Sequence, residues 1–200
     1  QILNLELFTP ELSLAAFAIV VILLDLLTER KWLLAVVSIT GLAVAAGFSI
    51  ALWGGGTQAI FNNMLAVDNF ALLFKLIFLG VAALVILASV DYTAKFARFR
   101  GEYYALILLS TLGMMLMAAT MELIAIYIAL ELTSISLYVL VGFLKGPKSN
   151  EASLKYLLLG AVASAVLLFG MALIFGFTGE TQLSHIAQSI QAMPLQTLVA

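Results

Sequence analysis

The sequence of 200 residues contains no cysteine, three prolines, one histidine and little charge. Without cysteine, the chain can form neither disulfides nor thiolate-bound metal or iron–sulfur sites. Charged residues make up 10% of the chain, against about 25% in soluble domains. The mean hydropathy of +1.17 and the hydrophobic content of 64% instead indicate an integral membrane protein. A net charge of −2 argues against nucleic-acid binding, and no glycine-rich phosphate loop or metal cluster is apparent.

Six segments reach the length of about 20 apolar residues that a membrane-spanning helix needs. They predict an all-α polytopic membrane protein with helices at about 10–27, 32–53, 69–90, 102–119, 121–144 and 151–177. Thr9 and Asp68 are the expected N-caps of the first and third helices. Only Thr120 and Glu122 mark the break between the fourth and fifth helices. A single helix over 102–144 would be about 64 Å long, twice the hydrocarbon thickness, so the chain must turn there.

Lysine and arginine alternate between the predicted loops. Seven of them lie in the first, third and fifth loops, and none lies in residues 1–9, 54–68 or 178–194. By the positive-inside rule, the basic loops face the cytoplasm and both visible termini face outside. The basic residues are Arg30, Lys31, Lys95, Arg98, Arg100, Lys145 and Lys148. Residues 178–194 are then an outer loop, and 195–200 look like the start of a seventh helix in a longer protein.

Glu131 lies in the middle of the apolar fifth helix. Inserting a carboxylate there costs roughly 2.5–3.5 kcal/mol, so such residues are usually functional. We expect Glu131 to take up and release a proton. The alternative is a structural glutamate that bonds to Thr133, Ser134 or a neighbouring helix. Tyr127 shares its helix face and could contact the carboxylate, although a tyrosine at such a position more often only packs.

Two lysines also lie inside apolar segments. Lys155 is one turn inside the sixth helix, four residues after Glu151, and is a second proton-transfer candidate. Its alternative is an i,i+4 ion pair with Glu151 at the membrane surface. Lys75, in the second turn of the third helix, is a weaker candidate. It could instead extend to the surface or pair with Asp68.

One stretch resembles a known family. Residues 128–180 contain Glu-Leu-x-Ser-x-x-Leu-Tyr around Glu131 and Glu-Ala-x-x-Lys-Tyr at 151–156, followed by small residues at 160–165. These motifs are similar to the antiporter-like membrane subunits of respiratory complex I, and most like subunit N of bacterial NADH–quinone oxidoreductase. The segment at 67–74 is similar to the family's entry to its third helix. The resemblance is specific from Ile128 onward and loose before Leu65.

The resemblance implies that this chain is the N-terminal part of a fold of roughly 14 helices. It implies a subunit that moves protons through Glu131 and Lys155, with no cofactor in this chain. NADH, FMN, iron–sulfur clusters and quinone would then lie on partner subunits. Other membrane-arm subunits of the complex and the lipid bilayer would be its partners, in a bacterial cytoplasmic membrane.

Two other interpretations stay open at this point. A subunit of a multi-subunit Na⁺/H⁺ antiporter or of a membrane-bound hydrogenase would share the same glutamate and lysine pattern. A non-catalytic membrane scaffold would tolerate Glu131→Gln with an effect on stability alone.

Overall fold

The computed structural model describes residues 5–28, 30, 32–95 and 99–192. Within this part of the chain, six helices are long and apolar enough to cross a membrane. They are α1 (Thr9–Leu27), α2 (Trp32–Ala51), α3 (Asn69–Ala88), α4 (Arg100–Ala119), α5 (Leu123–Val141) and α6 (Pro147–Thr178). The smaller elements are η1 (Leu5–Phe8), β1 (Gln58–Ile60), β2 (Leu65–Val67), η2 (Tyr92–Lys95) and α7 (Leu183–Ala192). The predicted fold class is confirmed.

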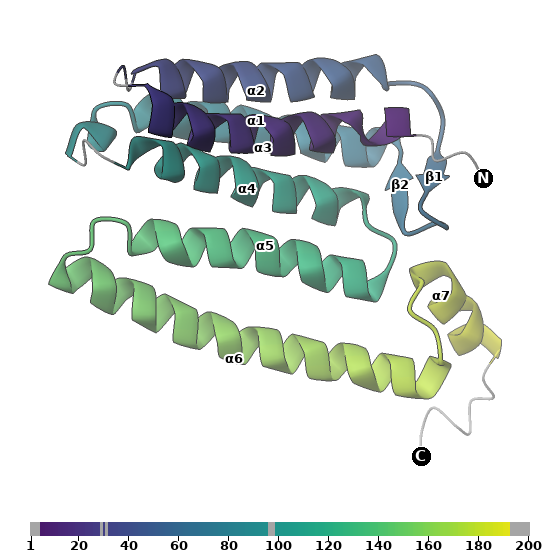
Figure 1. Ribbon diagram of the computed structural model, residues 1–200. Helices are drawn as coiled ribbons and strands as arrows, with labels where there is room; N and C mark the ends of the chain where they lie inside the picture. The colour runs from purple at the N-terminus through teal and green to yellow at the C-terminus, as the bar shows by residue number, and fades with distance from the viewer. Residues whose placement is uncertain (1–4, 29, 31, 96–98, 193–200) are drawn as a thin grey trace.

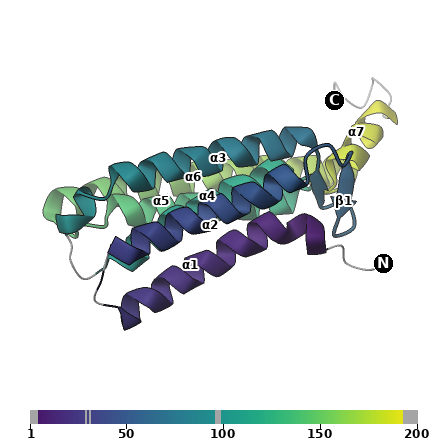
Figure 2. The ribbon, with the colours of Figure 1, turned by 90° about the horizontal axis from the view of Figure 1, so that it is seen from above.

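The first four long helices form a closed bundle. Each of α1–α4 packs against its neighbours in the order α1, α2, α3, α4, and α4 returns to α1. Helix α5 packs on the open side of α4, and α6 packs mainly on α5, so the last two helices extend the bundle sideways (Figures 1 and 2). Of the six helices, α4, which lies between the four-helix bundle and α5, is the most buried, and α6, at the edge, is the least buried.

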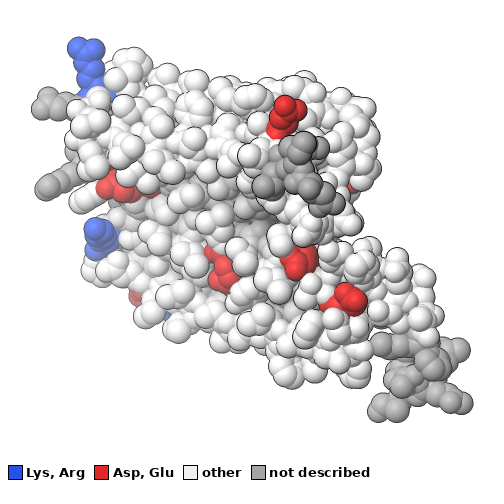
Figure 3. Space-filling model, turned by 45° about the vertical axis from the view of Figure 1, so that its right-hand side comes forward, with Lys and Arg blue, Asp and Glu red and all other residues white. Residues whose placement is uncertain are grey.

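The molecule has two chemically different ends. The α1–α2, α3–α4 and α5–α6 connections lie together at the left in Figure 1, and the hairpin, the α4–α5 turn and α7 lie at the other end. We call these the basic end and the hairpin end. The basic side chains visible in Figure 3 gather at the basic end, where Arg30, Lys145 and Lys148 are exposed. Lys31 and Arg98 lie outside the described residues.

Helix starts follow the local sequence, with two differences from expectation. Asp68 caps α3 as predicted, because its carboxylate accepts a hydrogen bond from the Ala71 N–H at 2.7 Å. Thr9, however, is the first residue of α1 and not its cap; η1 runs directly into the helix, and the Thr9 hydroxyl donates to the Glu6 carbonyl of that turn. Helix α6 begins four residues early, at Pro147, because proline suits the first helical turn.

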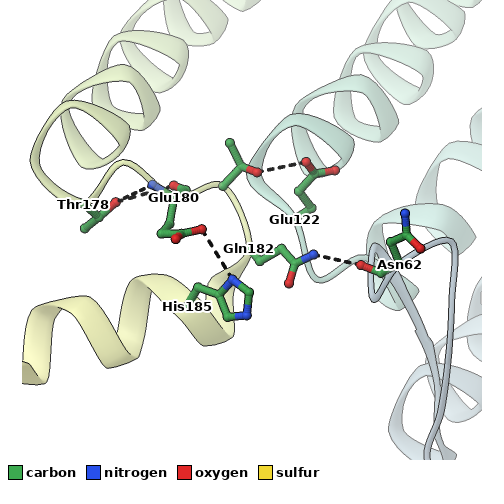
Figure 4. Close-up of polar contacts among 7 residues, drawn as sticks. Asn62, Glu122, Thr178, Glu180, Gln182 and His185 are labelled. Carbon is green, nitrogen blue, oxygen red and sulfur yellow. Dashed lines mark hydrogen bonds and ion pairs between the residues drawn. The ribbon is translucent and has the colours of Figure 1, made fainter.

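The α4–α5 turn is extended and joins the hairpin. The Met121 N–H donates to the Met64 carbonyl at 2.8 Å, and the Leu183 N–H donates to the Met121 carbonyl at 3.0 Å. Side chains add to this connection: the Thr181 hydroxyl donates to the Glu122 carboxylate at 3.0 Å, and the Gln182 amide donates to the Asn62 carbonyl at 2.8 Å (Figure 4). These extended residues confirm the predicted turn.

Residues 178–194, expected to form a loop, contain the short helix α7. Leu183, Ile186 and Ile190 recur at helical spacing, and Ile186 is buried. A stripe of three apolar side chains is too short to suggest a membrane span, and of the three only Ile186 is buried. The expected start of a seventh helix at 195–200 lies outside the described residues.

Candidate functional site: charged side chains inside the helices

Glu131 lies on the face of α5 that is turned toward α6. Tyr127 precedes it by one helical turn on this face, and Tyr138 follows it by two. Tyr127 contributes to a pocket shared with α6, and the Tyr138 ring packs on Tyr156 of α6 with ring centroids 4.9 Å apart. Glu131 is half-buried, and its Oε1 atom is buried without a hydrogen-bond partner in the described chain. A solvent-shielded carboxylate oxygen is thus available to a proton or a water molecule.

Helix α4 fixes the register of the turn that carries Glu131. The Thr133 hydroxyl donates to the Ala129 carbonyl at 3.1 Å and lies 3.4 Å from the Ser110 carbonyl of α4. The two helices approach closely at Gly113, where any side chain would collide with Thr133 and with the Ala129 carbonyl. The back of α5 is therefore held rigidly while its front faces α6.

Helix α6 is held to α5 near the basic end. The Ser153 hydroxyl donates to the Tyr138 carbonyl at 2.8 Å, and the Ser149 hydroxyl donates to the Val141 carbonyl at 2.7 Å. The Tyr138 hydroxyl lies against Gly160, where a Cβ atom would overlap it. The small residue at 160 is thus required by the packing of a tyrosine two turns from Glu131.

Lys155 points away from α5. Its Nζ atom lies 2.5 Å from Glu151 Oε1, and the two side chains are 70% and 64% exposed. Ser153 and Tyr156, the neighbours that contact α5, define the opposite face of α6. The predicted i,i+4 pair is present, whereas the structure does not bring Lys155 and Glu131 together within this chain.

Lys75 is the most deeply buried cation of the described chain. Its Nζ atom lies 2.5 Å from Glu11 Oε1, and the two side chains are 1% and 2% exposed. The expectations that Lys75 extends to the surface or pairs with Asp68 were wrong, because Asp68 is used as the cap of α3 and Glu11 of α1 is closer. Figure 1 places both helix starts at the hairpin end.

Two apolar clusters enclose this ion pair. Toward the hairpin end, Leu7 and Leu72 belong to a cluster with residues of the hairpin and α4. Toward the bundle centre, Leu14 and Leu79 belong to the main core. Glu11 lies between Leu7 of η1 and Leu14 of α1, and Lys75 lies between the two leucines of α3. The pair is therefore a polar layer between two apolar ones, in which Glu11 Oε2 has no hydrogen-bond partner among the described residues.

Sequence reasoning missed Glu11 because it lies in the first turn of α1. An acidic residue there is favoured by the helix dipole alone, so its position gave no reason to assign it a buried partner. The available signal was that Glu11 has Leu7 four residues before it and Leu14 three residues after it, on the face that α1 buries. A carboxylate on the buried face of a helix requires a partner.

Comparison with known proteins finds related membrane subunits. Residues 120–199 match the model described as NADH:quinone oxidoreductase/Mrp antiporter, TM. NADH-quinone oxidoreductase subunit N of Dehalococcoides mccartyi is 50% identical over 95% of this chain, and that of Trichlorobacter lovleyi is 44% identical over 95%. Over nearly its whole length this chain is similar to the N-terminal part of antiporter-like membrane subunits.

Solved structures of antiporter-like assemblies share the fold. A chain of respiratory complex I from Thermus thermophilus matches with a TM-score of 0.75 and 33% identity over 87% of this chain. A chain of the archaeal membrane-bound sulfane sulfur reductase matches with a TM-score of 0.76 and 27% identity over 94%. The chain spans about two fifths of the length of its curated relatives, 39% for both bacterial subunits named above, and aligns with their N-terminal part.

The family match covers both motifs that suggested it. Glu131 and Lys155 lie within residues 120–199, whereas Glu11 and Lys75 precede them. Within the described residues, no group of three histidine or acidic side chains is placed to hold a metal ion.

Proposed function

We propose that this chain is part of a proton-translocating membrane-arm subunit of NADH–quinone oxidoreductase. The observation that carries the proposal is the 50% identity to subunit N across 95% of the chain. Within the chain, the Glu131 carboxylate lies inside an apolar helix, and its Oε1 atom has no hydrogen-bond partner among the described residues. The subunit would couple quinone reduction to proton transfer. NADH, FMN, the iron–sulfur clusters and quinone would be bound by partner subunits of the complex.

Glu131 is the proposed proton-carrying group. A positive charge that approaches its carboxylate favours the ionised form, and removal of that charge favours uptake of a proton. In a poorly screened interior, moving one charge by several ångströms changes this balance by more than 1.4 kcal/mol, which is a factor of about ten in proton occupancy. The coupling is thus electrostatic, since quinone reduction takes place elsewhere.

Lys155 is proposed to act on the other side of α6. Its exposed face is turned away from α5 and is available to the rest of the subunit or to a neighbouring subunit. There its ammonium can exchange Glu151 for another partner, which would move positive charge along the membrane plane. Lys75, the third candidate from the sequence, is neutralised by Glu11, and we assign it to the stability of the four-helix bundle.

The proposed location is a bacterial cytoplasmic membrane. The basic end would face the cytoplasm, and the hairpin end and both visible termini would face outside, as the positive-inside rule requires. Other membrane-arm subunits would cover the exposed apolar faces.

A second candidate is a related complex with the same membrane fold. The structural match to the sulfane sulfur reductase favours this candidate, because its TM-score of 0.76 is as high as the 0.75 found for complex I. Purification of the full-length subunit with its natural partners discriminates the two candidates. NADH-dependent quinone reduction by the purified complex supports the first, and its absence from an intact complex supports the second.

The proposal is tested by Glu131→Gln in the full-length subunit, within the assembled complex in sealed vesicles. Proton uptake and quinone reduction are measured together. We expect both to fall by about a hundredfold, the typical contribution of a positioned proton-transfer group. Glu122→Gln, at the hairpin end of the same helix, is the matched control and should leave both rates near wild type. Unchanged rates in an assembled Glu131→Gln complex would contradict the proposal and favour a scaffold.

A further inference from the structure

The loop between α5 and α6 folds onto the start of α4 at the basic end (Figure 1). The ring centroids of Tyr103 and Phe143 lie 5.4 Å apart, and the Lys145 Nζ atom lies 4.9 Å from the centroid of the Phe99 ring. Phe99 directly precedes α4, and Lys148 follows the loop in the first turn of α6. The loop lysine and the starts of α4 and α6 therefore form one continuous surface.

The positive charges of this surface are not neutralised by the described chain. Lys145 and Lys148 are exposed, and neither forms an ion pair with a described residue. Arg100, the first residue of α4, is half-buried, and its Nε atom is shielded without a hydrogen-bond partner in that part of the chain. Asp25 and Glu102, carboxylates of α1 and α4 at this end, each have an interaction of their own. Three cations are thus available to an anion from outside.

The backbone holds Lys145 in a conformation that is unusual for lysine. Its φ of +52° lies in the left-handed region, which glycine adopts far more readily than residues with a side chain. The Lys145 N–H donates to the Gly142 carbonyl at 3.0 Å, so this conformation closes the turn after α5. Glycine would fit here with less strain. What lysine adds at this position is a cation and the contact with Phe99.

Exposed apolar side chains border the three cations. Phe99 is 41% exposed and Leu144 is 46% exposed. Both lie just outside the ends of spanning helices, the level at which side chains meet lipid headgroups. Clusters of cations at this level attract anionic headgroups. A phospholipid matches both parts of the surface, because its phosphate is an anion and its acyl chains are apolar. The hairpin end lacks this combination, since residues 54–68 and 178–192 contain no Lys or Arg.

We propose that Phe99, Arg100, Leu144, Lys145 and Lys148 form a binding surface for an anionic phospholipid. The phosphate contacts the two lysines and Arg100, and the acyl chains lie against Phe99 and Leu144. The proposal is independent of the role of Glu131, and it holds for whichever leaflet the basic end meets.

The test is photo-crosslinking of the assembled complex in vesicles. The vesicles contain a small fraction of diazirine-labelled phosphatidylglycerol, which is anionic, or the same fraction of labelled phosphatidylcholine, which is zwitterionic. The full-length subunit is digested, and the labelled peptides that contain residues 99–100 or 144–148 are quantified by mass spectrometry. In the wild-type complex, phosphatidylglycerol should label these peptides more strongly than phosphatidylcholine.

Lys145→Gly is the decisive variant, because glycine suits the left-handed backbone and the loop should keep its fold. Labelling by phosphatidylglycerol should fall about fivefold, and about thirtyfold when Lys148→Gln is added, as expected for basic residues near a membrane surface. Labelling by phosphatidylcholine should stay the same. Lys145→Arg keeps the charge and should keep the labelling.

Arg30→Gln is the matched control, since it removes one exposed charge from the α1–α2 connection at the same end. It should leave the labelling unchanged. An equal loss in Arg30→Gln would overturn the proposal, because the net charge of the basic end would then attract the lipid. An equal loss in Lys145→Arg would also overturn it, because the charge would not be what binds.

Three further results would contradict the proposal. Equal labelling of the wild type by the two lipids would show that the surface does not recognise an anionic headgroup. Absence of these labelled peptides from the assembled complex would show that a neighbouring subunit covers the surface. Loss of labelling in inorganic phosphate, but not in chloride of the same ionic strength, would identify free phosphate as the ligand in place of a lipid.

Discussion

Glu11 and Glu131 lie in opposite surroundings. Glu11 is paired with Lys75 inside the closed four-helix bundle, and the two side chains are almost fully shielded. Glu131 lies on the sideways extension of that bundle, half-buried, with one oxygen unpartnered and no cation of the described chain beside it. A neutral pair between apolar layers resists any change in its charge, because either protonation change would leave one buried charge uncompensated. A lone carboxylate at an interface can change its charge at lower cost.

This contrast separates stability from function. The Glu11–Lys75 pair joins α1 to α3, whereas Glu131 is the proposed site of proton exchange. The predictions below test that separation, beginning with the largest expected change in free energy.

Breaking the buried pair on one side should have the largest effect on stability. Lys75→Met leaves the Glu11 carboxylate buried and unpaired, which destabilises a protein by about 3–5 kcal/mol. The double variant Glu11→Leu with Lys75→Met removes both charges and should recover most of that loss. Thermal unfolding of the full-length subunit in detergent gives the comparison. A double variant less stable than Lys75→Met would show that the pair does more than balance its own charges.

Adding a methyl group where α4 and α5 meet should have the next largest effect. At Gly113 a Cβ atom collides with Thr133 and with the Ala129 carbonyl, and overpacking of this kind costs about 1–3 kcal/mol. Gly113→Ala should therefore lower the unfolding temperature and displace the turn that holds Glu131. Gly80→Ala in α3 is the matched control, because no atom lies within 4 Å of a Cβ atom built there. Equal losses in both variants would count against the close approach.

Removing the exposed pair on α6 should have the smallest effect on stability. Glu151→Gln should change the free energy of unfolding by less than about 0.5 kcal/mol, because exposed i,i+4 pairs contribute little. Lys155→Met should be as stable but should lower proton uptake in the assembled complex. If Lys155→Met keeps wild-type uptake, the exposed lysine has only the surface role that its pairing with Glu151 shows.

Much of the fold could be predicted from sequence because the bilayer imposes a simple rule on helix length. The six spans, the Asp68 cap and the α4–α5 turn followed from apolar length and local polar residues. The hairpin and α7 could not be predicted, because their segments are too short to show a clear hydrophobic periodicity. They are held by contacts between distant parts of the chain, such as the hydrogen bond from Gln182 to Asn62.

The charged residues show the same limit. The positions of Glu131 and Lys155 within apolar segments can be seen in the sequence alone, and their proposed roles stay predictions. Which side chains they contact depends on helix rotation. Lys155 therefore proved to lie on the face away from α5, and Lys75 proved to pair with Glu11 of α1. The sequence of either helix alone does not indicate that α1 and α3 are joined by an ion pair.

The most direct test of the central contrast is the number of protons taken up per quinone reduced, in sealed vesicles that contain either Glu131→Gln or the double variant Glu11→Leu with Lys75→Met. Assembly is verified in each preparation. The account predicts that the charge-free double variant keeps the wild-type ratio, while Glu131→Gln loses proton uptake. The opposite pattern, with uptake lost in the double variant and kept in Glu131→Gln, would contradict the account and place proton transfer in the four-helix bundle.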